Sequence, residues 1–172
     1  MSHAPVEVAP RRYRESFGRY YEDFVVGDTY EHRPGRTISE ADNTWFTLLT
    51  MNTHPLHFDA EYGKASEFGR CIVASPLTLA ILVGMSVTDV SQKAIANLGW
   101  RDIRMTAPVY PGDTLYAESE VLEKRESNSR PTAGLVTVRT IGKNQTGKVI
   151  CSFERTILVA KRGHSVEDRI GY

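Results

Sequence analysis

The chain has 172 residues, 41% hydrophobic and 24% charged, a composition that suits one globular domain with a single core. Its 21 basic and 21 acidic residues cancel, so no overall charge draws it to nucleic acid or to an anionic membrane. The lack of net charge also removes the repulsion between copies that would oppose self-association. The first residues lack the pattern of a secretory signal. The longest apolar stretch, residues 71–85, is shorter than the ~20 residues of a membrane span.

No internal repeat or linker divides the sequence, so we expect one domain over residues 17–161. The polar segments 1–16 and 162–172 are expected to form an N-terminal arm and a C-terminal tail, the latter fraying or covering a neighbouring subunit. Cys71 and Cys151 are the only cysteines and lack metal-type spacing. They predict two reduced thiols in a cytoplasmic protein.

The first half of the chain predicts a strand over residues 28–37 and then a helix that begins at Ser39. Ser39 is a good N-cap, and acidic residues follow it in the first turn. The helix is expected to stop near Asn52, because Pro55 disfavours helical geometry in the residue before it. One apolar face is marked by residues at i, i+3 and i+4: Trp45, Leu48 and Leu49.

An irregular loop over residues 52–57 is expected next, followed by a short helix over 60–66 and a longer one over 76–90. Pro76 suits the first turn of that longer helix. Its apolar face is expected to hold Leu77, Ala80, Ile81, Gly84 and Met85.

From residue 98 onward the hydrophobic period changes from 3.6 to 2. Four strands are predicted, over residues 98–107, 113–125, 133–143 and 147–160. Turn signals at Pro111-Gly-Asp and Gln145-Thr-Gly indicate an antiparallel meander. One apolar helix with a long antiparallel sheet predicts the α+β class, with the sheet wrapped around the helix.

The stretch 50–59 reads Thr-Met-Asn-Thr-His-Pro-Leu-His-Phe-Asp and carries the polar chemistry of the chain. Its two histidines, one asparagine and one aspartate crowd into a loop that proline stiffens. A histidine there exchanges a proton near neutral pH, which suits the addition or removal of water. The alternative is that these side chains only cap the flanking helices.

This loop resembles the signature of the MaoC-like dehydratases, or (R)-specific enoyl-CoA hydratases, which reads roughly Gly-Asp-x-Asn-Pro-x-His. Pro55, Leu56 and His57 match it. Other segments resemble further family motifs in the same order and extend the resemblance over most of the chain: Phe24–Asp28, Gly69–Ser75 and Ala107–Thr114.

The resemblance implies a hot-dog fold, a homodimer or higher even oligomer, and an acyl-CoA thioester as substrate, with no cofactor besides the coenzyme A that the substrate carries. The catalytic pair of the family is an Asp and a His five residues apart, which fall on Asn52 and His57. An amide orients water through its oxygen but takes up no proton. Either His57 alone exchanges the proton while Asn52 positions the water, or another carboxylate substitutes (Asp59 is nearest), or activity is lost.

The oxyanion donor of the family, a backbone N–H near the start of the central helix, falls on Ser75. A helix N-terminus stabilises a developing enolate, so we expect the Ser75 amide in this role, with a plain N-cap as the alternative. His54 replaces the Asn before proline. It either lines the pocket mouth or faces solvent.

Arg70, Arg101 and Arg104 suggest a finer hypothesis about the substrate. If one of them enters the pocket, it would hold a carboxylate on a short branched dicarboxylyl-CoA of the mesaconyl or itaconyl kind. Otherwise they are solvated charges. No metal site is predicted, because His54-x-x-His57 lacks a third ligand. Three other histidines have no supporting constellation: His3, His32 and His164.

Three functions follow from these observations. The first is a hydratase or dehydratase of enoyl-CoA and 3-hydroxyacyl-CoA, with His57 as base. The second is an acyl-CoA thioesterase, against which stands the absence of Asp and Glu from residues 72–88. The third is a non-catalytic acyl-CoA-binding or assembly subunit, for which Asn52 is the best argument.

Overall fold

The computed structural model describes residues 5–171. The elements in chain order are strands β1 (Val6–Ala9) and β2 (Arg12–Arg14), 3-10 helix η1 (Tyr21–Asp23), strand β3 (Thr29–Thr37), helix α1 (Glu40–Leu49), 3-10 helix η2 (Pro55–His57), helices α2 (Ala60–Ala65) and α3 (Ser75–Met85), π-helix η3 (Val87–Ser91), strands β4 (Ala94–Met105), β5 (Thr114–Glu126), β6 (Ala133–Lys143) and β7 (Val149–Ala160), and helix α4 (Val166–Ile170).

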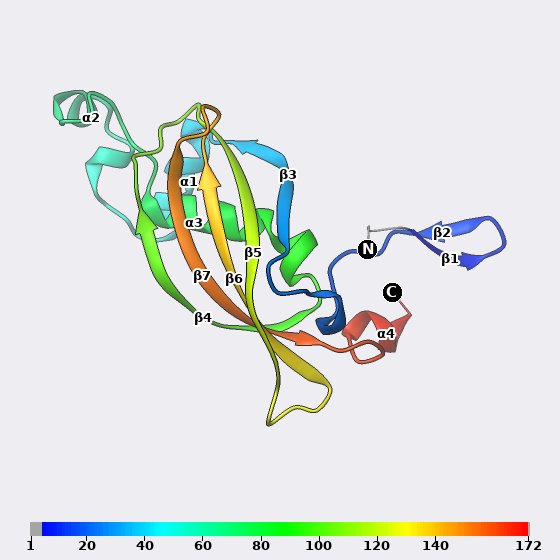
Figure 1. Ribbon diagram of the computed structural model, residues 1–172. Coiled ribbons are helices and arrows are strands. Elements are labelled where there is room, and N and C mark those ends of the chain that lie inside the picture. The colour runs from blue at the N-terminus through cyan, green and yellow to red at the C-terminus, as the bar shows by residue number, and fades with distance from the viewer. Residues whose placement is uncertain (1–4, 172) are drawn as a thin grey trace.

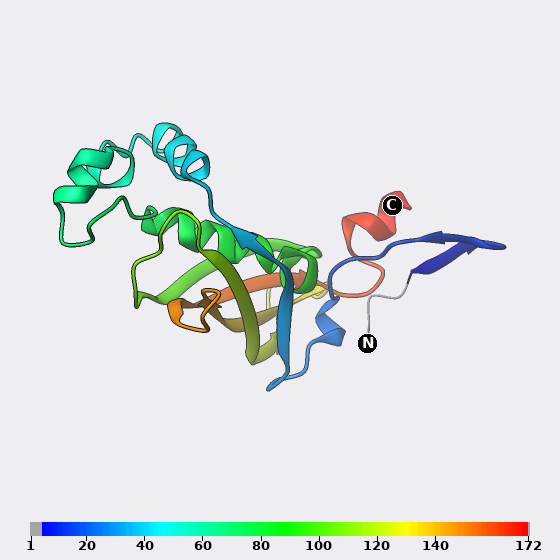
Figure 2. The same cartoon turned by 90° about the horizontal axis from the view of Figure 1, so that it is seen from above.

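A five-stranded antiparallel sheet in the order β3-β5-β6-β7-β4 curves around α3 (Figures 1 and 2). This confirms the predicted α+β class with a helix wrapped by the sheet. Strands β3, β5, β6 and β7 lie where the sequence predicts them. Strand β4 begins at Ala94 instead of residue 98, because repeated register shifts against β7 interrupt its alternation.

Helix α1 begins as predicted. Ser39 Oγ accepts from the Asp42 backbone N–H at 3.1 Å, and Asp42 Oδ2 accepts from the Ser39 backbone N–H at 2.8 Å. The helix ends at Leu49, and Met51 follows with a positive φ of 56°. Its apolar face, however, lies outside the core of this chain: Trp45, Leu48 and Leu49 are 65%, 70% and 80% exposed.

The central helix α3 buries part of the face that periodicity predicts, since Leu77 is buried and Ile81 and Met85 pack partly buried against the core. Leu77, Thr78 and Leu82 are buried, while Ala80 and Gly84 are exposed. The helix is apolar on every side, so its hydrophobic pattern does not select the face that meets the sheet. The predicted helix over 76–90 is also two elements, since α3 ends at Met85 and a π-helical turn follows.

The two ends of the sheet carry different additions (Figures 1 and 2). Helices α1 and α2 lie at one end, and the β1–β2 hairpin and α4 lie at the other. Both hairpin strands are exposed throughout. Part of the predicted tail is helical and fixed, because the Tyr20 hydroxyl donates to Asp168 Oδ1 at 2.6 Å. Of the predicted arm and tail, residues 1–4 (with His3) and 172 lie outside the described residues.

Candidate functional site

The predicted irregular loop between α1 and α2 is a tight 3-10 turn, η2. Pro55 opens it, and the Asp59 backbone N–H donates to the Pro55 carbonyl at 2.8 Å. The Asn52 backbone N–H donates to the Thr47 carbonyl at 3.0 Å, which ties the start of the loop to α1. The turn therefore holds its polar side chains on a rigid frame, as a site between two helices requires.

His57 is half-buried, and its ring orientation is set by the segment that leads into α3. Its Nδ1 lies 3.0 Å from the Ile72 carbonyl oxygen, which only accepts hydrogen bonds. Nδ1 therefore carries the ring proton and donates it to that oxygen, which leaves Nε2 with a lone pair. Among residues 5–171, Nε2 has no hydrogen-bond partner. This is the state that a general base needs.

Asn43 fixes the frame around His57, and sequence reasoning missed it. This buried side chain of α1 donates through Nδ2 to the His57 carbonyl at 2.7 Å and to the Ile72 carbonyl at 3.0 Å. Its Oδ1 accepts from the Ala74 backbone N–H at 2.9 Å. One amide thus joins α1, the histidine loop and the start of α3. The available signal was an asparagine inside a helix, just after the cap, where it is a poor helix former.

Asn52 holds the loop through its oxygen. Oδ1 accepts from the His54 backbone N–H at 3.1 Å, forming an Asx turn. Among the described residues its amide nitrogen has no hydrogen-bond partner, so both N–H donors remain free, and the oxygen keeps one lone pair. Asp59 is the N-cap of α2, where Oδ1 accepts from the backbone N–H groups of Glu61 and Tyr62 at 3.0 and 3.1 Å. The capping interpretation therefore fits Asp59.

His54 lies beside His57, with 5.8 Å between the ring centroids. Tyr62 meets the His54 ring edge-on at 5.9 Å. His54 Nδ1 accepts from the Leu56 backbone N–H at 3.1 Å, so it is also the N-cap of η2. The side chain is exposed, and its Nε2 has no partner within the described part of the chain.

Ser75 opens α3, and the helix cap before it is Ala74, which makes no side-chain capping bond. The N-cap alternative for Ser75 is therefore wrong. Its backbone N–H has no partner among residues 5–171, as expected at the first turn of a helix. Ser75 lines a cavity of about 290 Å³ with Phe68, Ile72, Thr78 and Thr106.

None of the three arginines considered above lines this cavity. The Arg70 guanidinium stacks over the Tyr110 ring at 3.9 Å. Arg101 Nε donates to Glu154 Oε2 at 2.6 Å on the exposed side of β4. Arg104 is an exposed residue of the same strand. Within the described residues, no group of three or more His, Cys, Asp or Glu side chains could hold a metal ion, and no helix has the length and hydrophobicity to span a bilayer.

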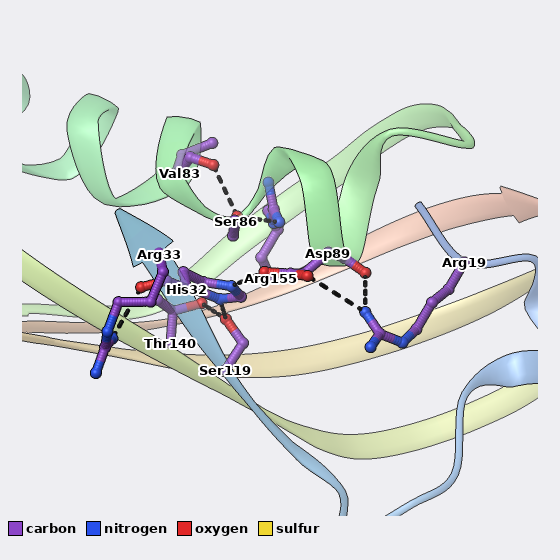
Figure 3. Close-up of polar contacts among 9 residues, drawn as sticks. All are labelled: Arg19, His32, Arg33, Val83, Ser86, Asp89, Ser119, Thr140 and Arg155. Atoms are coloured by element: carbon purple, nitrogen blue, oxygen red, sulfur yellow. Dashed lines mark hydrogen bonds and ion pairs between the residues drawn. The ribbon is translucent and has the colours of Figure 1, made fainter. Parts of the chain in front are cut away.

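A second polar cluster lies near the other end of α3 (Figure 3). The buried ring of His32 on β3 has Nδ1 2.9 Å from Asp89 Oδ2 of η3 and Nε2 2.8 Å from Ser119 Oγ of β5. Ser119 Oγ lies 2.8 Å from Thr140 Oγ1 of β6, and Arg19 Nη1 lies 3.7 Å from Asp89 Oδ1. The Ser–His–Asp order is that of hydrolytic triads, but Ser119 is 0% exposed, so no substrate reaches its hydroxyl.

Arg155 of β7 extends this cluster toward the C-terminus of α3 (Figure 3). It is 1% exposed, and its Nη2 donates to Ser86 Oγ at 2.9 Å. Burial lowers the pKa of its guanidinium to about 10. A cation at a helix C-terminus is stabilised by the helix dipole. The cluster therefore anchors the far end of the central helix to the sheet.

Comparison with known proteins identifies the family and the fold of the chain. The family model described as mesaconyl-CoA hydratase matches residues 6–170. The mesaconyl-CoA hydratase of Cereibacter sphaeroides is 37% identical over 145 residues, which are 84% of this chain and 42% of that protein. The chain thus spans about two-fifths of the length of this curated relative.

Two solved structures extend the comparison. A putative MaoC domain protein dehydratase from Chloroflexus aurantiacus superposes with a TM-score of 0.80 at 36% identity, over 84% of this chain and 41% of that one. A Mycobacterium tuberculosis protein described as having a double hotdog fold superposes with a TM-score of 0.77 at 24% identity, over 84% of this chain and 44% of that one. The hot-dog fold and the MaoC-like resemblance are therefore confirmed.

Proposed function

The chain belongs to the mesaconyl-CoA hydratase family, and from this membership we propose that it adds water to, or removes it from, a short branched or dicarboxylic acyl-CoA thioester. The observation that carries the proposal is the contact of His57 Nδ1 with the Ile72 carbonyl, because it leaves Nε2 ready to accept a proton.

In the hydration direction, His57 Nε2 removes a proton from water as the water oxygen bonds to C3 of the enoyl group. The electrons of the C2–C3 double bond move toward the thioester, whose oxygen gains charge. We assign the stabilisation of this oxygen to the Ser75 N–H at the first turn of α3. Its lack of a hydrogen-bond partner within residues 5–171 supports this role. The imidazolium then returns the proton to C2. The proposal requires no cofactor, and Asn52 acts by holding the loop.

The direct test is the loss of enoyl thioester absorbance in the ultraviolet with purified protein. We expect His57→Ala to lower kcat by about 10²–10⁴, the usual contribution of a general base. His164→Ala is the matched control, because His164 is exposed and lies beside α4 at the opposite end of the sheet. A His57→Ala variant that hydrates as fast as the wild type would refute the proposal.

We further propose that the protein is a homodimer and that it is located in the cytoplasm. A homodimer is supported by the exposed apolar face of α1 and by relatives about twice as long as this chain. A cytoplasmic location is supported by Cys71 and Cys151, which are both unpaired.

A non-catalytic acyl-CoA-binding subunit is the second candidate, and the amide at Asn52 favours it. Tight binding of a panel of acyl-CoA thioesters without turnover of any of them would establish it. A thioesterase would release free thiol from acyl-CoA, which a thiol reagent detects. Helix α3 offers no carboxylate for that reaction.

A further inference from the structure

We infer that His54, together with the amide of Asn52, forms a carboxylate-binding site that selects acyl chains bearing a carboxylate on C3. This inference rests on the proposed function for its place in a reaction, but the binding it describes is measurable without turnover. It assigns recognition of the acyl group to two neutral side chains that donate hydrogen bonds, in place of Arg70, Arg101 or Arg104.

The backbone fixes which ring nitrogen of His54 is the donor. Because Nδ1 accepts from the Leu56 backbone N–H at 3.1 Å, the proton of the neutral ring lies on Nε2. His57 has the opposite arrangement, since its Nδ1 donates to the Ile72 carbonyl and its Nε2 is unprotonated. The turn therefore presents one N–H donor and one basic nitrogen from neighbouring rings.

Asn52 supplies further donors of the same kind. Its oxygen accepts from the His54 backbone N–H, which orients the side chain. The NH₂ group has no hydrogen-bond partner within residues 5–171 and can donate to a ligand. The nearest carboxylate in the sequence, Asp59, is bound to two backbone N–H groups at the start of α2, which partly neutralises its charge. An anion bound at this loop therefore faces two hydrogen-bond donors, the His54 Nε2–H and the Asn52 NH₂ group.

The chemistry of the acyl chain matches this arrangement. In a butenedioyl thioester the free carboxylate is bonded directly to C3, the carbon that water attacks. When C3 of such a substrate meets the water held by His57, the carboxylate is only one bond away from the reacting carbon. The His54 ring, 5.8 Å from the His57 ring between centroids, is close enough to donate to it.

The first experiment measures binding with thioesters that cannot be hydrated. Succinyl-CoA carries a carboxylate on C3, and butyryl-CoA carries a methyl group there. We expect the wild type to prefer succinyl-CoA in isothermal titration, and His54→Phe to reduce that preference roughly 10–100-fold, the usual effect of a hydrogen bond to a charged group. His54→Gln, which keeps a side-chain N–H donor, should restore part of it.

Thr53→Ala is the matched control, because Thr53 is an exposed neighbour in the same loop, and it should keep the wild-type preference. An unchanged preference in His54→Phe, or an equal loss of affinity for both ligands, would overturn the inference.

The second experiment compares turnover of mesaconyl-CoA, with its free carboxylate on C3, and tiglyl-CoA, which has a methyl group in that place. His54→Phe should lower the ratio of the two kcat/KM values, mainly through KM for mesaconyl-CoA. Wild-type turnover of tiglyl-CoA with no preference for mesaconyl-CoA leaves the hydratase proposal standing and refutes the carboxylate site. A preference for succinyl-CoA without turnover of any thioester would support the carboxylate site and refute the hydratase proposal.

Discussion

Three histidines of this chain have three different roles because their backbone and side-chain partners differ. His57 donates through Nδ1 to a carbonyl, His54 accepts through Nδ1 from a backbone N–H, and His32 lies between a carboxylate and a hydroxyl. Each contact fixes a tautomer, and with it whether the remaining nitrogen donates or accepts. The chemistry of an imidazole is therefore decided by one neighbouring atom.

Asn43 provides a sharp test at the residue scale. Asn43→Asp keeps the size of the side chain but removes both donors. The carbonyls of His57 and Ile72 then each lose the hydrogen bond from residue 43 and face a carboxylate. We expect the free energy of unfolding to fall by ~1–3 kcal/mol. We also expect kcat to fall at least ~10-fold with little change in KM, because the base is displaced. Urea denaturation and the hydration assay measure the two effects.

Asn128→Asp is the control for this change, because Asn128 is exposed and lies in the loop between β5 and β6. It should alter neither quantity. Wild-type kcat in Asn43→Asp would show that the amide does not position His57.

His32 predicts how stability depends on pH. Burial lowers its pKa, and this outweighs the opposite effect of Asp89, while Arg155 and Arg19 lower the pKa further. The unfolded chain therefore binds the proton more readily. Its contribution to stability is complete above the unfolded pKa of about 6.5 and declines as the pH falls below it.

The measurement is urea denaturation between about pH 7.5 and about pH 5.5. The free energy of unfolding of the wild type should fall by at most ~1.4 kcal/mol per pH unit from this group. His32→Gln should be less stable at the higher pH and show a flatter profile. Parallel profiles for the two proteins would mean that His32 does not titrate on unfolding.

At the scale of elements, the position of α3 depends on a glycine in the sheet beneath it. A Cβ built on Gly142 of β6 would lie 2.4 Å from Leu82 Cδ1, closer than atoms in real proteins approach. Leu82 is fully buried in a core that also holds Leu115, Ile150 and Phe153. The sheet can therefore wrap the helix this tightly only where a side chain is missing.

Gly142→Ala should destabilise the fold by ~1–3 kcal/mol, the usual effect of overpacking a core. Gly99→Ala on β4 is the matched control, since a Cβ there would have nothing within 4 Å. Thermal or urea unfolding measures both. Equal stability of the two variants would show that Leu82 moves aside without strain.

At the scale of the whole molecule, the α1 patch (Trp45, Leu48, Leu49 and Met51) is apolar and lies beside the histidine loop. Apolar clusters of this kind on a protein surface indicate an interface.

We therefore predict a dimer in sedimentation velocity, and a shift toward monomer in the double variant Leu48→Asp, Leu49→Asp. These side chains are 70% and 80% exposed, so the change should leave the fold of one chain intact by circular dichroism. A dimer that persists in this variant would place the interface elsewhere, with the exposed edge strands β3 and β4 as candidates.

The sequence by itself determined strands β3, β5, β6 and β7, the α1 cap and the place of His57 in a loop between two helices. These depend on local signals: alternation of period 2, a serine followed by acidic residues, and a stiff motif around Pro55. Only the tertiary structure decided which face of α3 is buried and that the apolar face of α1 is exposed. It also decided that the buried side chains of Asn43 and His32 form hydrogen bonds with several partners. Their partners are far away in the chain, and hydrogen bonds depend on distance and direction, which residue order does not contain.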